Sequence, residues 1–175
     1  MGGKIFKTGL VYLLLSVVVM LLDYLTKQWI VSNVPVNDIA GSIEVIPNFF
    51  RIIHVHNHGA AFSFLAGQNG WQVVFFSVIA IAVSCFCIRG MFKNSRSQLI
   101  SNTGYALIVG GALGNLYDRI AYGYVIDFLD FNFGNYHYPA FNVADCGICA
   151  GVFLWCVYEL FLNKNNKENS DNAGK

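Results

Sequence analysis

The chain has 175 residues, of which 55% are hydrophobic and only 12% are charged, and its formal net charge is +1. A soluble domain usually has about 25% charged residues, so this chain has too few polar side chains to cover a surface in water. The composition therefore predicts a membrane protein with a single domain. The chain has no basic cluster, so nucleic acid is excluded as an expected partner.

Four apolar stretches each approach the roughly 20 residues that a helix needs to cross a hydrocarbon core. They cover residues 9–25, 71–88, 99–117 and 140–162. We therefore expect an α-helical integral membrane protein with four transmembrane helices. Its single domain should cover residues 1–163, with a disordered cytoplasmic tail at 164–175. The first stretch is too long for a signal peptide and no cleavage site follows it, so we expect it to be retained.

The positions of Lys and Arg near the span ends predict the orientation, because cytoplasmic loops are enriched in basic residues. One side has eight of them: Lys4, Lys7, Arg89, Lys93, Arg96, Lys164, Lys167 and Lys175. The other side has three: Lys27, Arg51 and Arg119. The basic side also holds both termini. We therefore expect the N- and C-termini to be cytoplasmic.

The two outer segments have different patterns. Residues 42–56 are rich in Ile, Val and Phe and partly alternate with polar residues, which predicts a short strand or hairpin on the membrane surface. Residues 119–139 mix Tyr and Phe with polar residues, a composition that suits the membrane interface. No secondary structure is predicted for this second segment.

Seven of the ten acidic residues fall on or near the outer face: Asp23, Asp38, Glu44, Asp118, Asp127, Asp130 and Asp145. Ionisable groups within spans are costly, and they are candidates for function. Asp145 lies about one turn inside an apolar helix, with no basic residue within four positions. If a second carboxylate approached it, the two could share one proton and hold a water, as in aspartic proteases. The candidate partners are Asp23, Asp118, Asp127 and Asp130, and spacing alone does not choose between them.

Several of these residues also have purely structural interpretations. Asp23 and Lys27 are four positions apart and can pair on one helix face. Arg119 can anchor a helix at the interface by extending its charge toward water. Gly110 and Gly114 have the spacing that lets two helices approach closely.

Metal binding is a weaker interpretation of two other patterns. His54, His56 and His58 flank the predicted strand, but no carboxylate lies at ligand spacing. Cys146 and Cys149 are three residues apart, but no second pair completes a four-ligand site. We therefore expect no metal and no cofactor.

Five motifs in this order resemble those of bacterial lipoprotein signal peptidase (signal peptidase II), and the resemblance covers about residues 8–162. The first three are Asp23-x-x-Thr26-Lys27, Asn57-His58-Gly59-Ala60-Ala61-Phe62 and Gly110-Gly111-Ala112-Leu113-Gly114-Asn115-Leu116-Tyr117-Asp118-Arg119. The last two are Val125-Ile126-Asp127-Phe128 and Phe141-Asn142-Val143-Ala144-Asp145. One departure is Cys146, where this family often has Ser.

The resemblance implies a function and a site. The catalytic aspartates of the family fall on Asp127 and Asp145. The polar residues around its site, taken here as substrate-binding, fall on Asp23, Lys27, Asn57, Gly59, Asn115, Arg119, Asn142 and Ala144. The implied reaction is removal of the signal peptide from a diacylglyceryl-modified prolipoprotein, with cleavage just before the lipidated cysteine.

The resemblance also implies a location and a fold. The enzyme would be a monomer in the bacterial inner membrane, in contact with membrane lipid. Its active site would lie at the periplasmic face, under a small β-cradle.

A small transporter with Asp23 or Asp145 as a proton carrier is the rival class, but it predicts charges at the bilayer midplane and two similar halves. A scaffold without chemistry would leave the five motifs unexplained.

Overall fold

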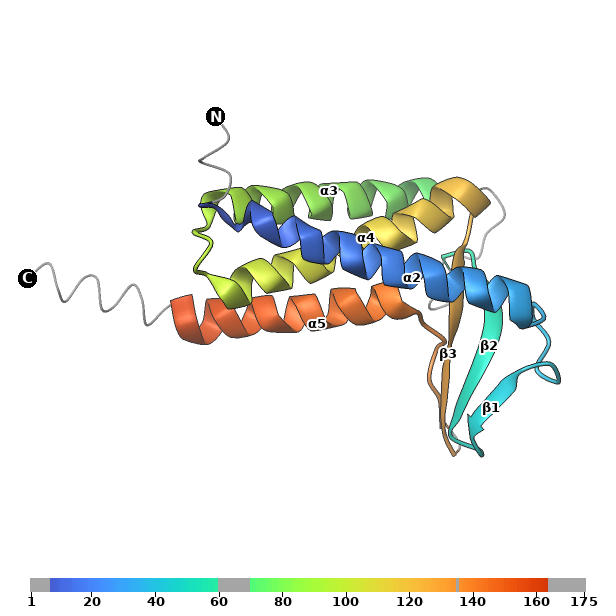
Figure 1. The fold of residues 1–175 in the computed structure, drawn as a ribbon. Coiled ribbons are helices and arrows are strands. Elements are labelled where there is room, and N and C mark those ends of the chain that lie inside the picture. Colours follow the sequence, from blue (N-terminus) through green and yellow to red (C-terminus); the bar gives the residue numbers. More distant parts are fainter. Residues whose placement is uncertain (1–6, 60–69, 135, 164–175) are drawn as a thin grey trace, which may run out of the picture.

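A computed structural model describes residues 7–59, 70–134 and 136–163, and four long helices dominate it (Figure 1). They are α2 (Leu13–Asn33), α3 (Trp71–Lys93), α4 (Leu99–Tyr122) and α5 (Val143–Val157). A 3₁₀ turn, η1 (Gly9–Tyr12), leads into α2, and a π-helical turn, η2 (Tyr158–Leu162), continues α5. The predicted tail at 164–175 and residues 60–62 of the second motif lie outside the described residues.

Helix α4 is the central helix of the bundle, because α2, α3 and α5 all pack against it. Its glycines allow this close approach. A Cβ atom on Gly110 would lie 2.7 Å from the Ser16 carbonyl oxygen of α2, and one on Gly111 would overlap the Ala144 carbonyl oxygen of α5. The packing role predicted for the glycine motif is therefore confirmed.

Three of the described helical segments are long and apolar enough to cross a membrane: Gly9–Asn33, Trp71–Lys93 and Val143–Leu162. Helix α4, which contains the predicted span 99–117, has a suitable length but a more polar sequence. Its glycines and buried polar residues face the neighbouring helices. An α-helical membrane protein is thus confirmed, while the number of four spans stays a prediction.

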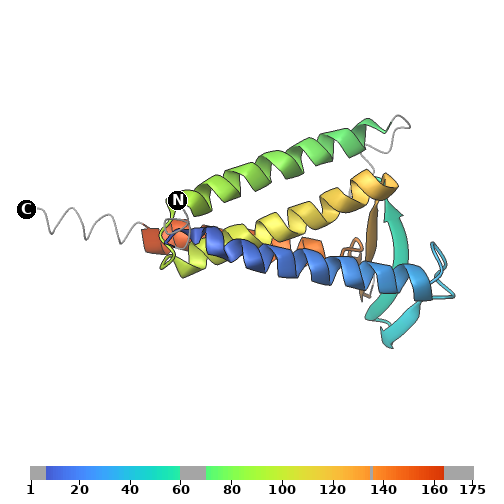
Figure 2. The same cartoon turned by 45° about the horizontal axis from the view of Figure 1, so that its top comes forward.

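A four-stranded antiparallel sheet lies at one end of the bundle, with the strand order β1-β2-β3-β4 (Figures 1 and 2). The strands are β1 (Ile43–Ile46), β2 (Phe50–Asn57), β3 (Val125–Phe133) and β4 (Tyr136–His137). Strands β1 and β2 form the hairpin predicted within residues 42–56. Strand β3, in the second outer segment, was not predicted from the sequence.

The opposite end of the bundle gathers three segments that are distant in the sequence. The backbone N–H of Arg96 donates to the Lys7 carbonyl, and that of Gly9 donates to the Asn94 carbonyl. Gln98 in turn donates from its side chain to the Tyr158 hydroxyl. The beginning of η1, the α3–α4 connection and η2 therefore share one end, and the sheet lies at the other.

Candidate active site

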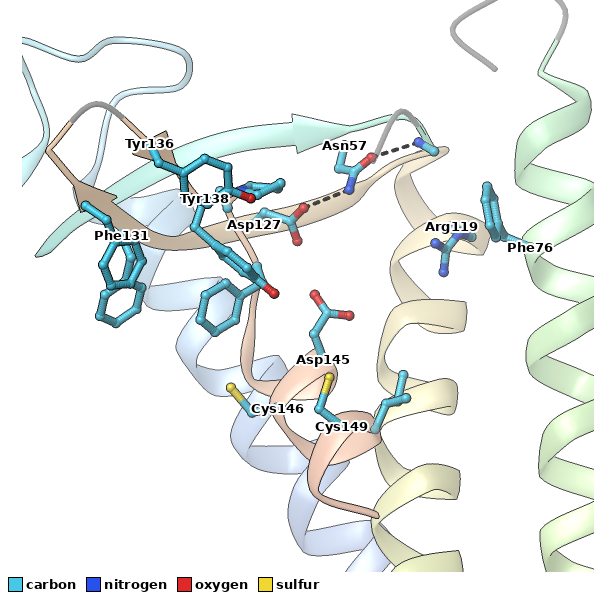
Figure 3. Close-up of a pocket in the computed structure, with 16 residues that line it drawn as sticks. Asn57, Phe76, Arg119, Asp127, Phe131, Tyr136, Tyr138, Asp145, Cys146 and Cys149 are labelled. Carbon is cyan, nitrogen blue, oxygen red and sulfur yellow. Dashed lines mark hydrogen bonds between the residues drawn. The ribbon is translucent and has the colours of Figure 1, made fainter. Parts of the chain in front are cut away.

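Asp127 and Asp145 come from different elements, and their carboxylates face each other (Figure 3). Asp127 is on β3, and Asp145 is in the first turn of α5. Asn142 begins that helix as its N-cap: its side chain accepts from the Asp145 N–H, and the Asp145 carboxylate accepts from the Asn142 N–H. This reciprocal capping box fixes the direction of the Asp145 side chain. It also explains why α5 begins at Val143 rather than at 140, where the fourth span was predicted to start.

Three asparagine side chains connect the two carboxylates. Asn142 donates from Nδ2 to Asp127 Oδ1 at 2.8 Å, and Asn115 donates from Nδ2 to Asp145 Oδ1 at 2.7 Å. The two amides also contact each other, because Asn142 Nδ2 lies 3.1 Å from Asn115 Oδ1. Asn57 donates to the other Asp127 oxygen at 2.9 Å. One amide network thus holds both carboxylates at the same cavity.

The other three candidate partners of Asp145 are engaged elsewhere. Asp23 and Asp118 each form an ion pair of 2.7 Å with Lys27. Asp130 pairs with Arg51 at 2.7 Å and with His137 at 2.9 Å. The structure therefore brings Asp127 together with Asp145, which the spacing in the sequence left open.

Burial changes the acid–base behaviour of Asp127. The side chain is almost fully buried, and its pKa is raised from the ordinary 3.8 to about 7, with desolvation as the largest cause. The nearby Asp145 charge also raises this pKa, whereas hydrogen bonds from Asn57 and Asn142 and the charge of Lys27 lower it. The protonated and ionised forms of Asp127 are therefore both present near neutral pH.

A buried lysine, Lys27, forms ion pairs and a hydrogen bond next to the two carboxylates. Lys27 is 1% exposed, and besides its two carboxylate partners it donates to Asn115 Oδ1 at 3.1 Å. Asp23 accepts from the Ala144 backbone N–H at 2.8 Å, and Asp118 accepts from the Ile126 N–H at 3.1 Å. These bonds connect the helix that carries Asp145 and the strand that carries Asp127 to one buried charge cluster. The ion pair between Asp23 and Lys27, which the sequence suggested as a structural role for both residues, is thus present in the structure.

A cavity of about 840 Å³ opens in front of the two carboxylates. Of the eight residues predicted to bind substrate, Asn57, Gly59 and Arg119 line it. The other five lie behind the cavity wall and hold the carboxylates in place: Asp23, Lys27, Asn115, Asn142 and Ala144.

Gly59 and Arg119 form one edge of this cavity. Gly59 has a positive φ of 98° and donates its N–H to Asn57 Oδ1 at 2.9 Å, which orients the amide that contacts Asp127. The Arg119 guanidinium lies 5.2 Å from the centre of the Phe76 ring and donates to the Asn115 carbonyl. Arg119 thus points into the site, beside a ring that sequence analysis did not single out.

Most of the apolar lining was not predicted. It consists of aromatic and aliphatic side chains and two thiols from α3, β3, β4, α5 and the connection between β4 and α5: Phe76, Phe131, Phe133, Tyr136, Tyr138, Phe141, Cys146, Ile148 and Cys149. The aromatic content of residues 119–139 was the available signal, but it was assigned to the membrane interface. With Pro139 and Ala140, these residues form an apolar wall around the carboxylates (Figure 3).

The cysteines are free thiols rather than disulfides. In the described part of the chain, no group of three His, Cys, Asp or Glu side chains is arranged to hold a metal ion. That the site works without a metal or cofactor stays a prediction.

Apolar helices with paired carboxylates at one cavity characterise a helical membrane enzyme. The family model described as "Signal peptidase (SPase) II" matches residues 15–161. The chain belongs to the signal peptidase II family, a family of aspartic-type proteases, as its motifs predicted.

Individual relatives agree with this assignment. A lipoprotein signal peptidase from Serratia proteamaculans (strain 568) is 47% identical over 167 residues, covering 95% of this chain and 96% of the relative. One from Yersinia pestis (strain Pestoides F) is 46% identical over 173 residues, covering 98% and 99%. A solved structure described as a bacterial membrane enzyme has a TM-score of 0.75 at 34% identity, covering 90% of this chain and 91% of that one. A second solved structure with that description has a TM-score of 0.74 at 33% identity, covering 87% and 94%.

Proposed function

We propose that this protein removes the signal peptide from lipid-modified prolipoproteins, with Asp127 and Asp145 as its catalytic pair. Cleavage falls just before the lipidated cysteine. The single observation that carries the site assignment is the amide network, in which Asn142 contacts both of the carboxylates that line one cavity. Membership of the signal peptidase II family supports the substrate class.

The two carboxylates have different roles in the reaction, because their surroundings differ. Asp145 takes a proton from a water between them as the water oxygen bonds to the scissile carbonyl carbon. Asp127, whose pKa burial raises to about 7, donates its proton to the carbonyl oxygen and so neutralises the developing charge. When the C–N bond breaks, the proton on Asp145 passes to the leaving amine. Asp127 recovers its proton as the new carboxyl group forms, so no covalent intermediate arises.

The position of the site suits a substrate that stays in the membrane. The carboxylates lie at the sheet end of the bundle, and the cavity wall is apolar and aromatic. A lipidated cysteine could therefore reach the site while its acyl chains remain among membrane lipids. The proposal includes a bacterial inner-membrane location, cytoplasmic termini, an active site at the periplasmic face, four spans in one domain and a monomeric enzyme.

A cleavage assay with carboxamide variants tests the catalytic pair. Purified enzyme is mixed with a diacylglyceryl-modified prolipoprotein, and loss of the signal peptide is followed by gel mobility. Asp127→Asn and Asp145→Asn should each fold, still bind substrate and lose cleavage by about 100-fold or more, because each keeps the side-chain volume but cannot exchange the proton. The matched control is Glu44→Gln, on an exposed carboxylate of β1, which should cleave normally. Full activity of either aspartate variant would overturn the assignment.

A chelator provides a second test. A water held by two carboxylates needs no Lewis acid, so cleavage should continue in a strong chelator. Loss of cleavage in chelator, with recovery on addition of zinc, would contradict this part of the proposal.

A further inference from the structure

Three histidines lie along β2 and directly after it, away from the catalytic cavity. His54, His56 and His58 are two residues apart, so their side chains lie on the same side of the strand. They alternate with Val55 and Asn57, and the Asn57 side chain reaches Asp127. The histidines therefore face away from the catalytic pair, and His54 contacts the end of α2, which lies beside the sheet (Figure 2).

The tautomer of His54 is determined by its backbone contact. Its Nδ1 lies 3.0 Å from the Val34 carbonyl oxygen. A carbonyl oxygen only accepts hydrogen bonds, so Nδ1 carries a proton and the Nε2 lone pair of this tautomer points toward His56. A histidine that ligates a metal typically has this arrangement, in which one ring nitrogen donates to a carbonyl and the other binds the ion.

A second imidazole nitrogen lies at chelating distance. His56 Nε2 donates a hydrogen bond to His54 Nε2 at 3.2 Å. A metal ion would replace the proton that the two nitrogens share. With metal–nitrogen distances of about 2.0–2.1 Å, two nitrogens at this separation subtend an angle of ~100° at the ion, close to tetrahedral. The His56 ring is held in place by stacking on Tyr124, at 3.8 Å between ring centres. The two nitrogens are thus already positioned for one ion.

A third imidazole lies beside the pair. His58 is exposed and contacts the Tyr124 ring on which His56 stacks, at 5.3 Å between ring centres.

Against the expectation from the sequence that these histidines bind no metal, we propose that His54 and His56 form a binding site for a divalent transition metal such as Zn²⁺, with His58 as the third protein ligand. Because the described residues contain no preformed three-ligand group, His58 must change its rotamer to reach the ion. Water would complete the tetrahedral shell. This site is separate from the hydrolytic reaction, because neither His54 nor His56 lines the catalytic cavity as described.

Zinc titration of the full-length enzyme tests the proposal. The protein is purified in detergent with a tag that contains no histidine, stripped of metal with a chelator, and titrated with Zn²⁺ by calorimetry. We expect one ion per chain. His54→Gln and His56→Gln should each weaken zinc binding by about tenfold or more, since each removes a direct ligand. His58→Gln should weaken binding less, and His137→Gln on β4 is the matched control that should leave it unchanged.

Two further measurements keep the proposal falsifiable if the buried His54 variant fails to fold. Zinc X-ray absorption of the wild-type protein should show at least two imidazole ligands and no sulfur. Sulfur scattering would overturn the proposal by assigning the ion to the cavity thiols Cys146 and Cys149. Zinc binding that His56→Gln leaves unchanged, or binding only at millimolar zinc, would also overturn it. Stripping the metal should not reduce cleavage of a lipidated substrate, which separates this test from that of the proposed function.

Discussion

Asn142 donates a 2.8 Å hydrogen bond from its side chain to Asp127, while its own side-chain oxygen caps the helix that carries Asp145. One residue therefore combines a structural role with a role in the site. The two roles can be separated, because serine is also a good N-cap but its short hydroxyl cannot replace the amide donor to Asp127.

Asn142→Ser and Asn142→Ala should lose activity to the same extent but should differ from each other in stability. Both remove the bond to Asp127, and loss of a hydrogen bond to a carboxyl group should reduce kcat by about tenfold to 100-fold. Only the alanine variant also loses the helix cap, which should cost a further ~1 kcal/mol in the free energy of unfolding. Cleavage kinetics and thermal unfolding in detergent measure the two effects. A serine variant with normal kcat would show that the contact with Asp127 is not used in the reaction.

The raised pKa of Asp127 predicts the alkaline side of the pH–activity profile. The proposed mechanism needs the Asp127 proton, so activity should fall as pH rises through about 7. The same shift affects stability: between pH 3.8 and about 7 the folded state binds more protons than the unfolded state, so this group stabilises the fold less as pH rises. The charges of Asp145 and Lys27 act on this pKa in opposite directions.

Asn57→Ala tests that assignment. Its amide stabilises the ionised form of Asp127, so its removal should raise the Asp127 pKa and move the alkaline limb to higher pH. The control is Asn33→Ala, an exposed asparagine that only caps the end of α2. An alkaline limb that stays in place in Asn57→Ala would show that another group controls it.

The hairpin and the strand beside it show what sequence pattern can reveal. The β1–β2 hairpin could be predicted because its apolar residues partly alternate with polar ones. Strand β3 begins with Val125, Ile126, Asp127 and Phe128, which are all buried, so it lacks alternation. Ile126 packs with Ile30 and Val34 near the end of α2. Because both faces of this strand are covered, a pattern of period two could not identify it.

The partner of Asp145 illustrates a second limit of prediction from the sequence. The sequence offered four aspartates at one end of the bundle as partners of Asp145, and only the family resemblance chose Asp127. In the structure the choice depends on long-range ion pairs: Lys27 on α2 engages Asp118 on α4, and Arg51 on β2 engages Asp130 on β3. Such pairings join residues about 80 to 90 positions apart, and single-sequence spacing contains no information about them. The aromatic cavity wall was missed for the same reason.

Lys27→Met should strongly destabilise the protein. Methionine retains much of the side-chain volume, but it leaves the carboxylates of Asp23 and Asp118 buried without their cation. Breaking a buried ion pair from one side costs about 3–5 kcal/mol. Arg51→Met is the comparison, because Arg51 is partly exposed at 26% and its loss should cost less. Thermal unfolding in detergent measures both, and equal stability of the Lys27 variant and the wild type would contradict the view that the cluster holds the site together.

Cysteine labelling tests the orientation. Ile39 follows α2 at the sheet end and is 70% exposed, whereas Ser97 is exposed in the connection between α3 and α4 at the other end. The eight basic residues on the Ser97 side predict that it faces the cytoplasm. In a background without the native cysteines, a membrane-impermeant thiol reagent applied to intact cells with a permeable outer membrane should label Ile39→Cys but not Ser97→Cys. After cell lysis both should react, which controls for accessibility. Labelling of Ser97→Cys alone in intact cells would place the carboxylate pair at the cytoplasmic face, where the lipidated substrates proposed here are not presented.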